Sequence, residues 1–396
     1  MKIVLLVTHP MTARLLLRGR LRHLAGAGFD VVLVTSPGPD LEGLAEAEGA
    51  EVRILPMARE IAPIRDTVAL VRLAHLLRRL RPDAVEASTP KAGLLGMLAA
   101  RWTRIPARIY TLRGLRLETT RGWKRRLLRW TERTASASAH RVLCVSASLR
   151  RRAVELGLVE NGKTAVPGAG SSNGVDAERF EGAAADRAGA ARLRSELGLP
   201  EGVPVVGFVG RFTRDKGIPE LVEALDRVRR EAPETRMLLL GDFEVGDPVP
   251  PELVERLRSD PRILLPGFVP DTAPYYPLMD VLAFPSHREG FPNAPLEAAA
   301  AGVPTVGARA TGVVDAVEDG RTGTLVPVDD AEALAQALLA YLEDPDLRRR
   351  HGEAARRRVG ESFCRELVQR AWEEAIREVA EGAGVASEER TPSRPS

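Results

Sequence analysis

Residues 203–225 read VPVVGFVGRFTRDKGIPELVEAL, and this stretch decides the fold. It opens with a β-branched run that favours a buried strand. It ends with apolar residues spaced three and four apart, which favours an amphipathic helix. Glycines and cations fill the loop between the two. A strand, a loop and a helix in this order are the unit from which parallel α/β sheets are built.

The same alternation of short strands and helices runs through both halves of the chain. The strands expected in the first half are Lys2–Val7, Val31–Thr35, Val52–Leu55, Ala84–Ala87, Ala107–Leu112 and Arg141–Ser146. Those expected in the second half are Val203–Val209, Arg236–Leu240, Ile263–Leu265, Val281–Phe284 and Pro304–Gly307. The pattern predicts an α/β protein with two Rossmann-like, doubly wound domains. We expect a cleft between them, because ligands bind at the carboxyl ends of such strands.

Length and charge both divide the chain. Its 396 residues exceed the roughly 250–300 that one hydrophobic core usually serves. Residues 1–180 carry 30 Lys+Arg and 16 Asp+Glu, a net charge of +14, whereas the remainder carries 27 and 38, a net charge of −11. We expect an N-terminal domain over 1–180, a linker over 181–200 and a C-terminal domain over 201–360. A terminal helix over 361–386 is expected to pack on the N-terminal domain, and 387–396 to be a disordered tail.

Composition excludes several classes of protein. Apolar residues make up 44% of the chain, as in ordinary globular proteins, and no apolar run approaches the roughly 18 residues of a membrane span. The first residues, MKIVLLV, are typical of a strand and not of a signal peptide. Cys144 and Cys364 stand far apart and are expected to be reduced, in a cytoplasmic protein. Nucleic acid is not an expected partner, since the basic half lacks an aromatic-laced sheet or a helix-turn-helix.

The loop after the strand at 203–209 is the strongest local signal of a site. Gly210 allows a close backbone approach, and Arg211 and Lys216 deliver two cations just before a helix begins at Ile218. An arginine fork, a lysine point charge and helix N–H groups together fit a diphosphate. A solvated basic turn is the alternative for any single pair of this kind.

A second constellation, HREGFPNAPLE, spans residues 287–297 and also joins a strand to a helix. Asn293 is expected to cap the helix, with Pro295 in its first turn. Glu289 in the loop and Glu297 in the helix offer carboxylates to the hydroxyls of an elongated ligand. Two glutamates at this spacing also arise by chance, and the Gly-Phe-Pro-Asn between them makes the match specific.

These pieces resemble the large family of retaining glycosyltransferases with a GT-B fold and two glutamates seven residues apart, the family-four type. The matching motifs are GRFTRDKG (210–217), LPGFVPD (265–271) and EGFPNAPLE (289–297). The resemblance implies that Arg211 and Lys216 hold the donor diphosphate, Glu289 contacts the transferred sugar and Glu297 binds the ribose. The further donor contacts that it implies are Gly210, Gly267, Phe268, Gly290, Phe291, Pro292 and Asn293.

The first half is similar to the capsule and exopolysaccharide branch of that family. The motifs are STPKAGLLG (88–96), RIYTLRGLRLET (108–119), VSASL (145–149) and GAGSSNGVD (168–176). Two features depart from the family: Leu112-Arg113-Gly114 stands where many relatives carry a histidine, and His9-Pro10-Met11-Thr12 replaces a Gly-Gly loop. The candidates for contacts with the acceptor or the sugar are Lys91, Arg113, Asn173 and His287.

The resemblance implies transfer of a sugar, with retention, from a nucleotide diphosphate donor, which we expect to be a UDP-sugar. The acceptor is expected to be lipid-linked or a surface polysaccharide. No metal and no cofactor are expected, because two fixed cations replace the divalent ion. Accordingly, Asp344-Pro345-Asp346 is interpreted as a helix-capping turn, and the six histidines form no metal-ligand pattern.

The basic segment WKRRLLRW, residues 123–130, predicts a helix that meets an anionic membrane surface. Leu127 and Trp130 are expected to pack inward. A core helix with a basic outer face is the alternative.

Two other functions share these features. A sugar-nucleotide 2-epimerase would bind the same donor between two such domains, although we find no convincing acid or base motif for it. A non-catalytic nucleotide-sugar-binding protein would keep Arg211, Lys216 and Glu297 without turnover. The near-fingerprint GAGSSN at 168–173 does not predict a dinucleotide enzyme, since asparagine replaces its last glycine.

Overall fold

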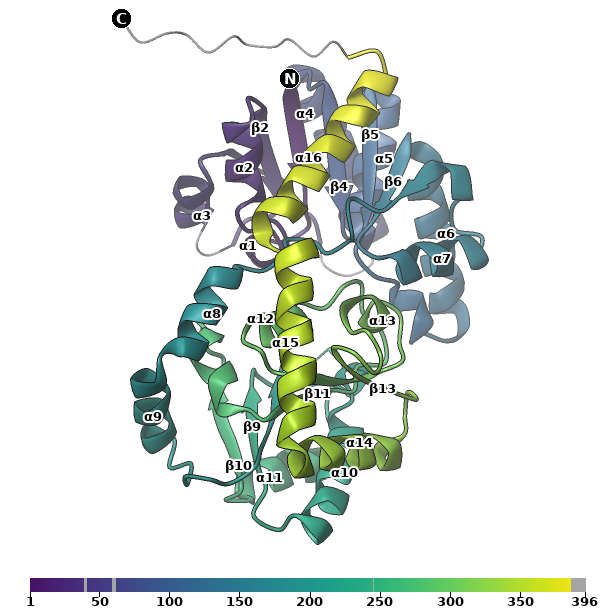
Figure 1. Cartoon of the computed structure of the whole chain (residues 1–396). Coiled ribbons are helices and arrows are strands. Elements are labelled where there is room, and N and C mark those ends of the chain that lie inside the picture. Colours follow the sequence, from purple (N-terminus) through teal and green to yellow (C-terminus); the bar gives the residue numbers. More distant parts are fainter. Residues whose placement is uncertain (39–40, 59–61, 245, 386–396) are drawn as a thin grey trace, which may run out of the picture. The chain divides into compact units, whose positions relative to one another are not determined.

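The computed structural model of this protein describes residues 1–38, 41–58, 62–244 and 246–385. These residues form two compact units, and each unit holds one sheet of parallel strands (Figure 1). The first unit is built from Met1–Asn173 and from the chain after Arg365. The second unit is Gly174–Arg365.

The first sheet has the strand order β3-β2-β1-β4-β5-β6-β7, and all of its pairs are parallel, as predicted. Its strands are β1 (Lys2–Leu6), β2 (Asp30–Thr35), β3 (Glu51–Ile54), β4 (Ala84–Ser88), β5 (Ala107–Leu112), β6 (Arg141–Cys144) and β7 (Thr164–Ala165). Every residue of β4 is buried. Such a strand is covered on both faces, which explains its continuous rather than alternating burial.

The helices of the first unit connect these strands. They are α1 (Pro10–Leu16), α2 (Arg20–Gly26), α3 (Leu41–Glu48), α4 (Pro63–Leu80), α5 (Pro90–Trp102), α6 (Gly122–Ser138), α7 (Ala147–Glu155) and the short η1 (Arg116–Glu118) and η2 (Asn161–Lys163). The sequence predicts one helix over Ala13–Ala27, but the structure has two. Gly19 stands directly before α2, between the two helices, and has a left-handed φ of 74°. A glycine adopts that conformation without steric cost.

The second sheet has the order β10-β9-β8-β11-β12-β13 and is also parallel throughout. Its strands are β8 (Val205–Val209), β9 (Arg236–Leu240), β10 (Ile263–Gly267), β11 (Val281–Phe284), β12 (Thr305–Ala308) and β13 (Gly323–Val326). The edge strand β13 was not expected from the sequence. Its GTLV is short and opens with glycine.

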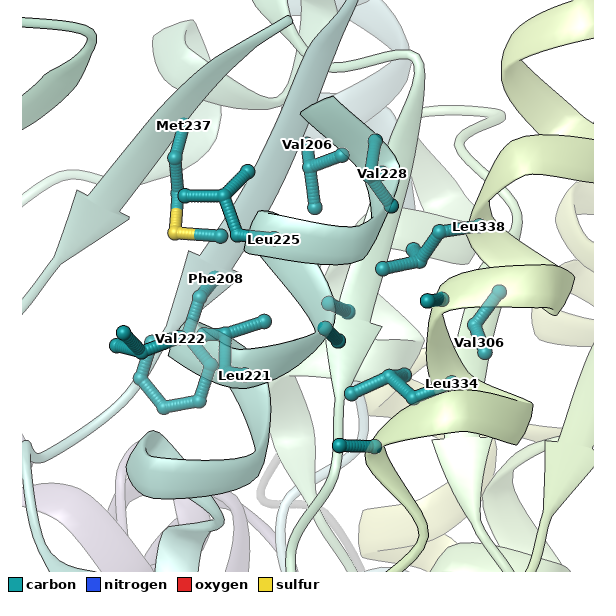
Figure 2. Packing of buried hydrophobic residues seen from close by; sticks show 14 of the residues in the cluster. Val206, Phe208, Leu221, Val222, Leu225, Val228, Met237, Val306, Leu334 and Leu338 are labelled. Carbon is teal, nitrogen blue, oxygen red and sulfur yellow. The ribbon is translucent and has the colours of Figure 1, made fainter. Parts of the chain in front are cut away.

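Helices α10 and α14 build the core of the second unit against this sheet. The helices and turns of the unit are α8 (Ala177–Ala185), α9 (Arg187–Glu196), η3 (Arg214–Lys216), α10 (Ile218–Glu231), α11 (Pro251–Ser259), η4 (Ala273–Leu278), α12 (Asn293–Ala300), α13 (Val313–Ala316), α14 (Ala331–Glu343) and α15 (Pro345–Ser362). Figure 2 shows Leu221 and Leu225 of α10 near Phe208 of β8, with Leu334 and Leu338 of α14 beside them. All five side chains are buried. Burial of each is favourable by about 1.5–3 kcal/mol.

Two segments differ from the boundaries expected for them. Residues 181–200, expected as a linker, instead belong to the second unit. They form the end of α8 and the whole of α9. The helix expected over 361–386 is α16 (Arg365–Gly382), which follows a break after α15. Phe363 lies at that break, where its buried ring packs 5.2 Å from the ring of Phe291. Burying this ring competes with continuing the helix.

Helix α16 packs within the first unit. Trp372 is fully buried, and its Nε1 donates a 3.0 Å hydrogen bond to the carbonyl oxygen of Ser171. The tail expected over 387–396 lies outside the described residues.

Both cysteines are free, as expected. Burial raises the pKa of the Cys144 thiol to about 12. Across the described ranges, each helix is too short or too polar to traverse a lipid bilayer.

Candidate active site

A lysine and a glutamate from distant parts of the second unit form an ion pair. Lys216 ends η3, which follows β8, and Glu289 lies in the loop after β11. Nζ of Lys216 contacts Oε1 of Glu289, and the two side chains are only 15% and 13% exposed. Oγ of Ser286 donates a 2.8 Å hydrogen bond to the same oxygen. Two donors therefore fix the position of the Glu289 carboxylate.

Two glycines let the backbone close around this loop. Gly217 has a φ of 75°, and a Cβ there would lie 2.3 Å from the carbonyl oxygen of Pro285. Gly312 has a φ of 79°, and a Cβ there would lie 2.5 Å from the carbonyl oxygen of Gly290. Other residues would be strained at both positions and would also collide with the backbone. The loop that carries Glu289 is thus held from two sides.

A second ion pair ties the same two segments together. Arg288 donates to Oδ2 of Asp215 at 2.7 Å, and Thr213 donates its hydroxyl to Oδ1 at the same distance. Burial raises the pKa of Asp215, but the Thr213 hydrogen bond and the charges of Arg288 and Lys216 outweigh it. The pKa is therefore lowered overall. Asp215, Arg288 and Ser286 are not among the site residues predicted from the sequence, although each adjoins a residue that is.

Arg211 also follows β8 but has a different partner from Lys216. Its side chain is 57% exposed and its guanidinium contacts the carboxylate of Glu244. The N–H of Gly210 is bonded to the carbonyl of Leu240 at 2.9 Å. The two predicted cations thus come from one loop, and Arg211 keeps a side chain that a ligand can reach.

His287 lies between two carboxylates. Its Nε2 is 3.0 Å from Oδ1 of Asp329 and 3.4 Å from Oε1 of Glu220. Glu220, and to a lesser extent Asp329, raise the pKa of the imidazole against the opposing effect of burial. Because the three residues come from different elements, their grouping did not appear in the sequence spacing. The same three ligand atoms lie within 4.8 Å of one another, close enough to surround a cation.

The carboxylate of Glu297 is positioned by two hydroxyl groups, one from η4 and one from the residue that precedes η4. Its Oε2 accepts hydrogen bonds from the Tyr276 hydroxyl at 2.8 Å and from the Thr272 hydroxyl at 3.2 Å. Burial, and then the neighbouring Glu297 charge, raise the pKa of Tyr276 well above its ordinary value. Neither hydroxyl was selected from the sequence, because nothing local connects 272–276 with 297.

The segment between the two glutamates forms the start of α12. The sequence predicts Asn293 as the cap, but Pro292 occupies the cap position and Asn293 begins the helix. The side chain of Asn293 makes no cap hydrogen bond, and its Oδ1 is buried without a hydrogen-bond partner in the described chain. Phe291 is buried, so only its backbone is left for a ligand.

Gly267 and Phe268 lie where β10 ends. Gly267 has a φ of 81°, and its carbonyl accepts a 3.0 Å hydrogen bond from the N–H of Gly241. The ring of Phe268 is 66% exposed. An exposed ring at the carboxyl end of a parallel strand offers an apolar face to a flat ligand.

Three sequence candidates lie in the first unit. Nζ of Lys91, in the first turn of α5, forms an ion pair with Asp66 at 2.8 Å. Nδ2 of Asn173 donates to the carbonyl of Leu15 at 2.6 Å. Arg113 follows β5, and its side chain is buried.

Two further expectations have clear outcomes. Asp344 caps α15 by accepting a 2.8 Å hydrogen bond from the N–H of Leu347, so the capping-turn interpretation is confirmed. Trp130 of α6 does not pack inward, since it is 59% exposed.

Two Rossmann-like parallel sheets in one chain, with a loop-borne arginine and lysine and a pair of glutamates in the second, define the GT-B class of glycosyltransferases. Residues 203–344 match the family model described as "Glycosyl transferases group 1". Residues 16–170 match the "Glycosyl transferase 4-like domain". The chain therefore belongs to the family-four glycosyltransferases.

Relatives agree along most of the chain. The capsular polysaccharide biosynthesis glycosyltransferase CapM of Staphylococcus aureus is 34% identical over 359 residues, which cover 91% of this chain and 92% of CapM. An Escherichia coli UDP-Gal:alpha-D-GlcNAc-diphosphoundecaprenol alpha-1,3-galactosyltransferase is 26% identical over 319 residues, covering 80% of this chain and 81% of that protein.

Solved structures share the fold. Anabaena HepE in complex with UDP and glucose has a TM-score of 0.79 at 21% identity, with 96% of this chain and 100% of that chain covered. WaaG, a glycosyltransferase involved in lipopolysaccharide biosynthesis, has a TM-score of 0.71 at 17% identity, with 95% and 99% covered.

Proposed function

We propose that this protein is a retaining, metal-independent glycosyltransferase that moves a sugar from a UDP-sugar to a lipid-linked or polysaccharide acceptor during synthesis of a surface glycan. The capsular role named for CapM and the diphosphoundecaprenol acceptor named for the E. coli relative support this choice. The donor UDP is supported by the name of the same E. coli enzyme and by the HepE complex.

The contact of Lys216 with Glu289 is the observation that carries the proposal. It puts a cation suited to a diphosphate beside a carboxylate suited to sugar hydroxyls, in the loops after two neighbouring strands. The bond to be broken in a nucleotide sugar joins these same two parts of the donor. The pair is therefore matched to the point where the reaction occurs.

The remaining donor contacts follow from their positions in the second unit. Glu297, held by Tyr276 and Thr272, accepts hydrogen bonds from the ribose hydroxyls. The ring of Phe268 and the backbone at Gly267 face the base. The backbone of Gly290–Asn293 and the amide of Asn293 bind the phosphates and the sugar, near the positive end of the α12 dipole.

In the reaction, the acceptor hydroxyl oxygen forms a bond to the anomeric carbon on the face that the diphosphate leaves. The electron pair of the breaking carbon–oxygen bond goes to the diphosphate, and the departing phosphate oxygen takes the acceptor proton. Arg211 and Lys216 stabilise the charge that develops on this leaving group. These two fixed cations serve the purpose of a divalent ion, and Glu289 holds the sugar during its displacement.

The first unit is assigned to the acceptor and to the membrane surface. Trp123 and Trp130 of α6 are seven residues apart, on one helix face, and are 65% and 59% exposed. Exposed basic residues surround them: Lys124, Arg125, Arg126, Arg129 and Arg133. A helix with exposed tryptophans among cations suits an interface of anionic headgroups. Lys91 would release Asp66 to meet an acceptor phosphate, and Asn173 would accept from an acceptor hydroxyl.

The experiment that tests this proposal measures nucleotide release and thermal stabilisation with UDP-, GDP- and dTDP-sugars in the presence of EDTA. We expect UDP-sugars alone to stabilise the protein and to be slowly hydrolysed, and Lys216→Ala and Glu289→Ala to abolish hydrolysis. Binding of no nucleotide sugar, or activity that requires a metal, would contradict the proposal. A product formed from the donor alone with an inverted sugar hydroxyl would indicate an epimerase instead.

A further inference from the structure

Arg113 carries a buried charge that has no hydrogen bond. Its side chain is 6% exposed, and Nε, Nη1 and Nη2 are all buried without a hydrogen-bond partner in the described residues. Leaving a buried charged donor unsatisfied is costly, so such groups are rare unless something else binds them. Arg113 stands directly after β5, at the carboxyl end of the parallel strands, where α/β proteins bind their ligands.

The surroundings of Arg113 compensate its positive charge only in part. Its Nη2 is 3.9 Å from Oε1 of Glu86, too far for a hydrogen bond. That oxygen already accepts from Thr111 at 2.7 Å and from Nη1 of Arg20 at 3.2 Å. Two guanidinium groups thus share one carboxylate. Burial, and then the charge of Arg20, lower the pKa of Arg113 to about 9.

Arg20 and Arg113 differ in how firmly they are held. Arg20 donates to Glu86 and, at 2.5 Å, to the carbonyl of Ser172, and its guanidinium lies 3.9 Å from the centre of the Trp372 ring. The guanidinium of Arg113 is 5.9 Å from the same ring, near the limit of a cation–π contact. Arg20 is therefore fixed by hydrogen bonds and a close ring contact, whereas Arg113 has no hydrogen bond to break before it binds a ligand.

Two other features at the carboxyl ends of β4 and β5 favour an anion. Ser88 of β4 is paired with Thr111 of β5, so the start of α5 and Arg113 leave the sheet from adjacent strands. The positive end of the α5 dipole favours negative charge. Beside it, the hydroxyls of Thr8 and Thr89 lie 2.7 Å apart.

We propose that Arg113 binds a phosphate group of the acceptor, turning from its place beside Trp372 to form paired hydrogen bonds with the phosphate oxygens. The planar guanidinium fork matches a phosphate, which supplies both the missing negative charge and the missing hydrogen-bond acceptors. This inference rests on the proposed function, since it assigns Arg113 to the acceptor of that reaction. The phosphate can belong to a lipid headgroup or to a small soluble molecule.

The test uses the full chain with Arg211→Ala and Lys216→Ala, so that the donor diphosphate site does not bind the probes. Farnesyl phosphate, farnesol and inorganic phosphate are titrated by calorimetry, with and without Arg113→Met. We expect Arg113→Met to weaken farnesyl phosphate binding at least tenfold and to leave farnesol unchanged. Arg113→Lys should keep part of the affinity, and Arg151→Met, an exposed arginine of α7, should change nothing. Equal affinity of Arg113→Met and the parent for farnesyl phosphate would overturn the proposal.

Comparison with inorganic phosphate distinguishes a lipid phosphate from a small soluble phosphate. Binding of farnesyl phosphate much more tightly than inorganic phosphate supports a lipid headgroup, whereas equal affinities support a small soluble phosphate. Thermal unfolding separates ligand binding from a structural role. Arg113→Met should keep or raise the melting temperature because it removes an unpartnered buried charge, and Arg20→Met should lower it. If Arg113→Met is instead destabilised like Arg20→Met, Arg113 is a structural partner of Glu86 and the proposal fails.

Failure of this inference is distinguishable from failure of the proposed function. Slow hydrolysis of a UDP-sugar without acceptor is measured on the native chain, and under the proposed function it depends on Lys216 and Glu289 of the second unit. Its absence in the native chain would contradict the proposed function, while phosphate binding at Arg113 would still be measured separately.

Discussion

The ammonium group of Lys216 contacts the carboxylate of Glu289, and the two residues extend from loops that follow the adjacent strands β8 and β11. Ser286 donates to the same carboxylate oxygen, so both contacts fall on Oε1 of Glu289. The cation and the carboxylate are thus placed by the sheet, and each limits the positions that the other can take.

Replacing Glu289 with glutamine should lower kcat about 100-fold or more, because the neutral amide is a weaker acceptor for sugar hydroxyls in the transition state. The affinity for UDP should stay close to that of the native protein. Lys216→Ala should lose both affinity for UDP and turnover. The measurement is steady-state transfer together with UDP binding by calorimetry. Equal loss of UDP affinity in both variants would show that Glu289 does not act on the sugar.

Ser286→Ala should lower kcat roughly tenfold, because a hydrogen bond to a charged group contributes about 1.5–3 kcal/mol and the Glu289 carboxylate would be less firmly placed. The donor KM should change little. Ser259→Ala, on α11, is the matched control and should behave as the native enzyme. A Ser286→Ala enzyme with native kcat would rule out this positioning role.

Tyr276→Phe should raise the KM for the UDP-sugar about tenfold with a smaller effect on kcat. It removes the 2.8 Å hydrogen bond that positions Glu297, the residue that we propose binds the ribose. Tyr275→Phe changes the neighbouring residue in the same way and serves as the control. The measurement is the donor dependence of the initial rate, and a fall in kcat alone would contradict a role in donor binding.

Glu132 should make the stability of the first unit depend on pH. Its carboxyl is buried and accepts a 2.6 Å hydrogen bond from Tyr110. Burial raises the pKa of Glu132 from 4.5 to about 7, although the Tyr110 hydrogen bond opposes this. Between pH 4.5 and about 7 the native state binds more protons than the unfolded state, so the free energy of unfolding falls as the pH rises. The loss is about 3 kcal/mol at 1.36 kcal/mol per pKa unit.

Urea unfolding of the native protein and of Glu132→Gln, at pH 5 and at pH 8, checks this expectation. The glutamine keeps a hydrogen-bond partner for Tyr110 but does not titrate, so the difference between the two proteins isolates Glu132. Glu160→Gln, at an exposed position, should follow the native protein at both pH values. If the free energy of unfolding changed equally between pH 5 and pH 8 in the native protein and in Glu132→Gln, Glu132 would not change its protonation in this range.

Trp123→Ala with Trp130→Ala should weaken binding to anionic vesicles at low salt by tenfold or more, because two exposed rings are removed from the basic face of α6. Sedimentation with vesicles of phosphatidylglycerol measures the bound fraction. Phe268→Ala removes an equally exposed ring from the second unit and should leave binding unchanged. Failure of the native protein to sediment at all would argue for an amphipathic helix with a purely structural role.

Most strands and their parallel arrangement could be predicted from the sequence because a strand covered on both faces reads as a plain apolar run, whereas the short edge strands β7 and β13 could not. Breaks in helices were harder to predict. Gly19 lies within an amphipathic pattern that continues on both sides, and its left-handed conformation at the N-cap of α2 is not visible in that pattern. The break at Phe363 depends on a contact with Phe291, 72 positions away, which no local pattern reveals.

Some residues of the candidate site could be predicted from the sequence and others could not. Lys216, Glu289 and Glu297 stand in recognisable motifs, so the sequence could select them. Tyr276 acts through a long-range contact that exists only after folding, and its own neighbours in the sequence give no sign of it. Asp215 stands next to Lys216, but its ion pair with Arg288 also forms only on folding.

Helix α10 anchors the loop that carries Lys216 to the core of the second unit. Lys216 stands two residues before this helix, whose buried face includes Leu221 and Leu225 in the core of the second unit (Figure 2). A cation that stands just before a helix with a buried face is not displaced by fraying of a surface segment. On heating, the protein should therefore remain competent to bind its donor until the whole second unit melts, with no inactive but still folded form preceding it.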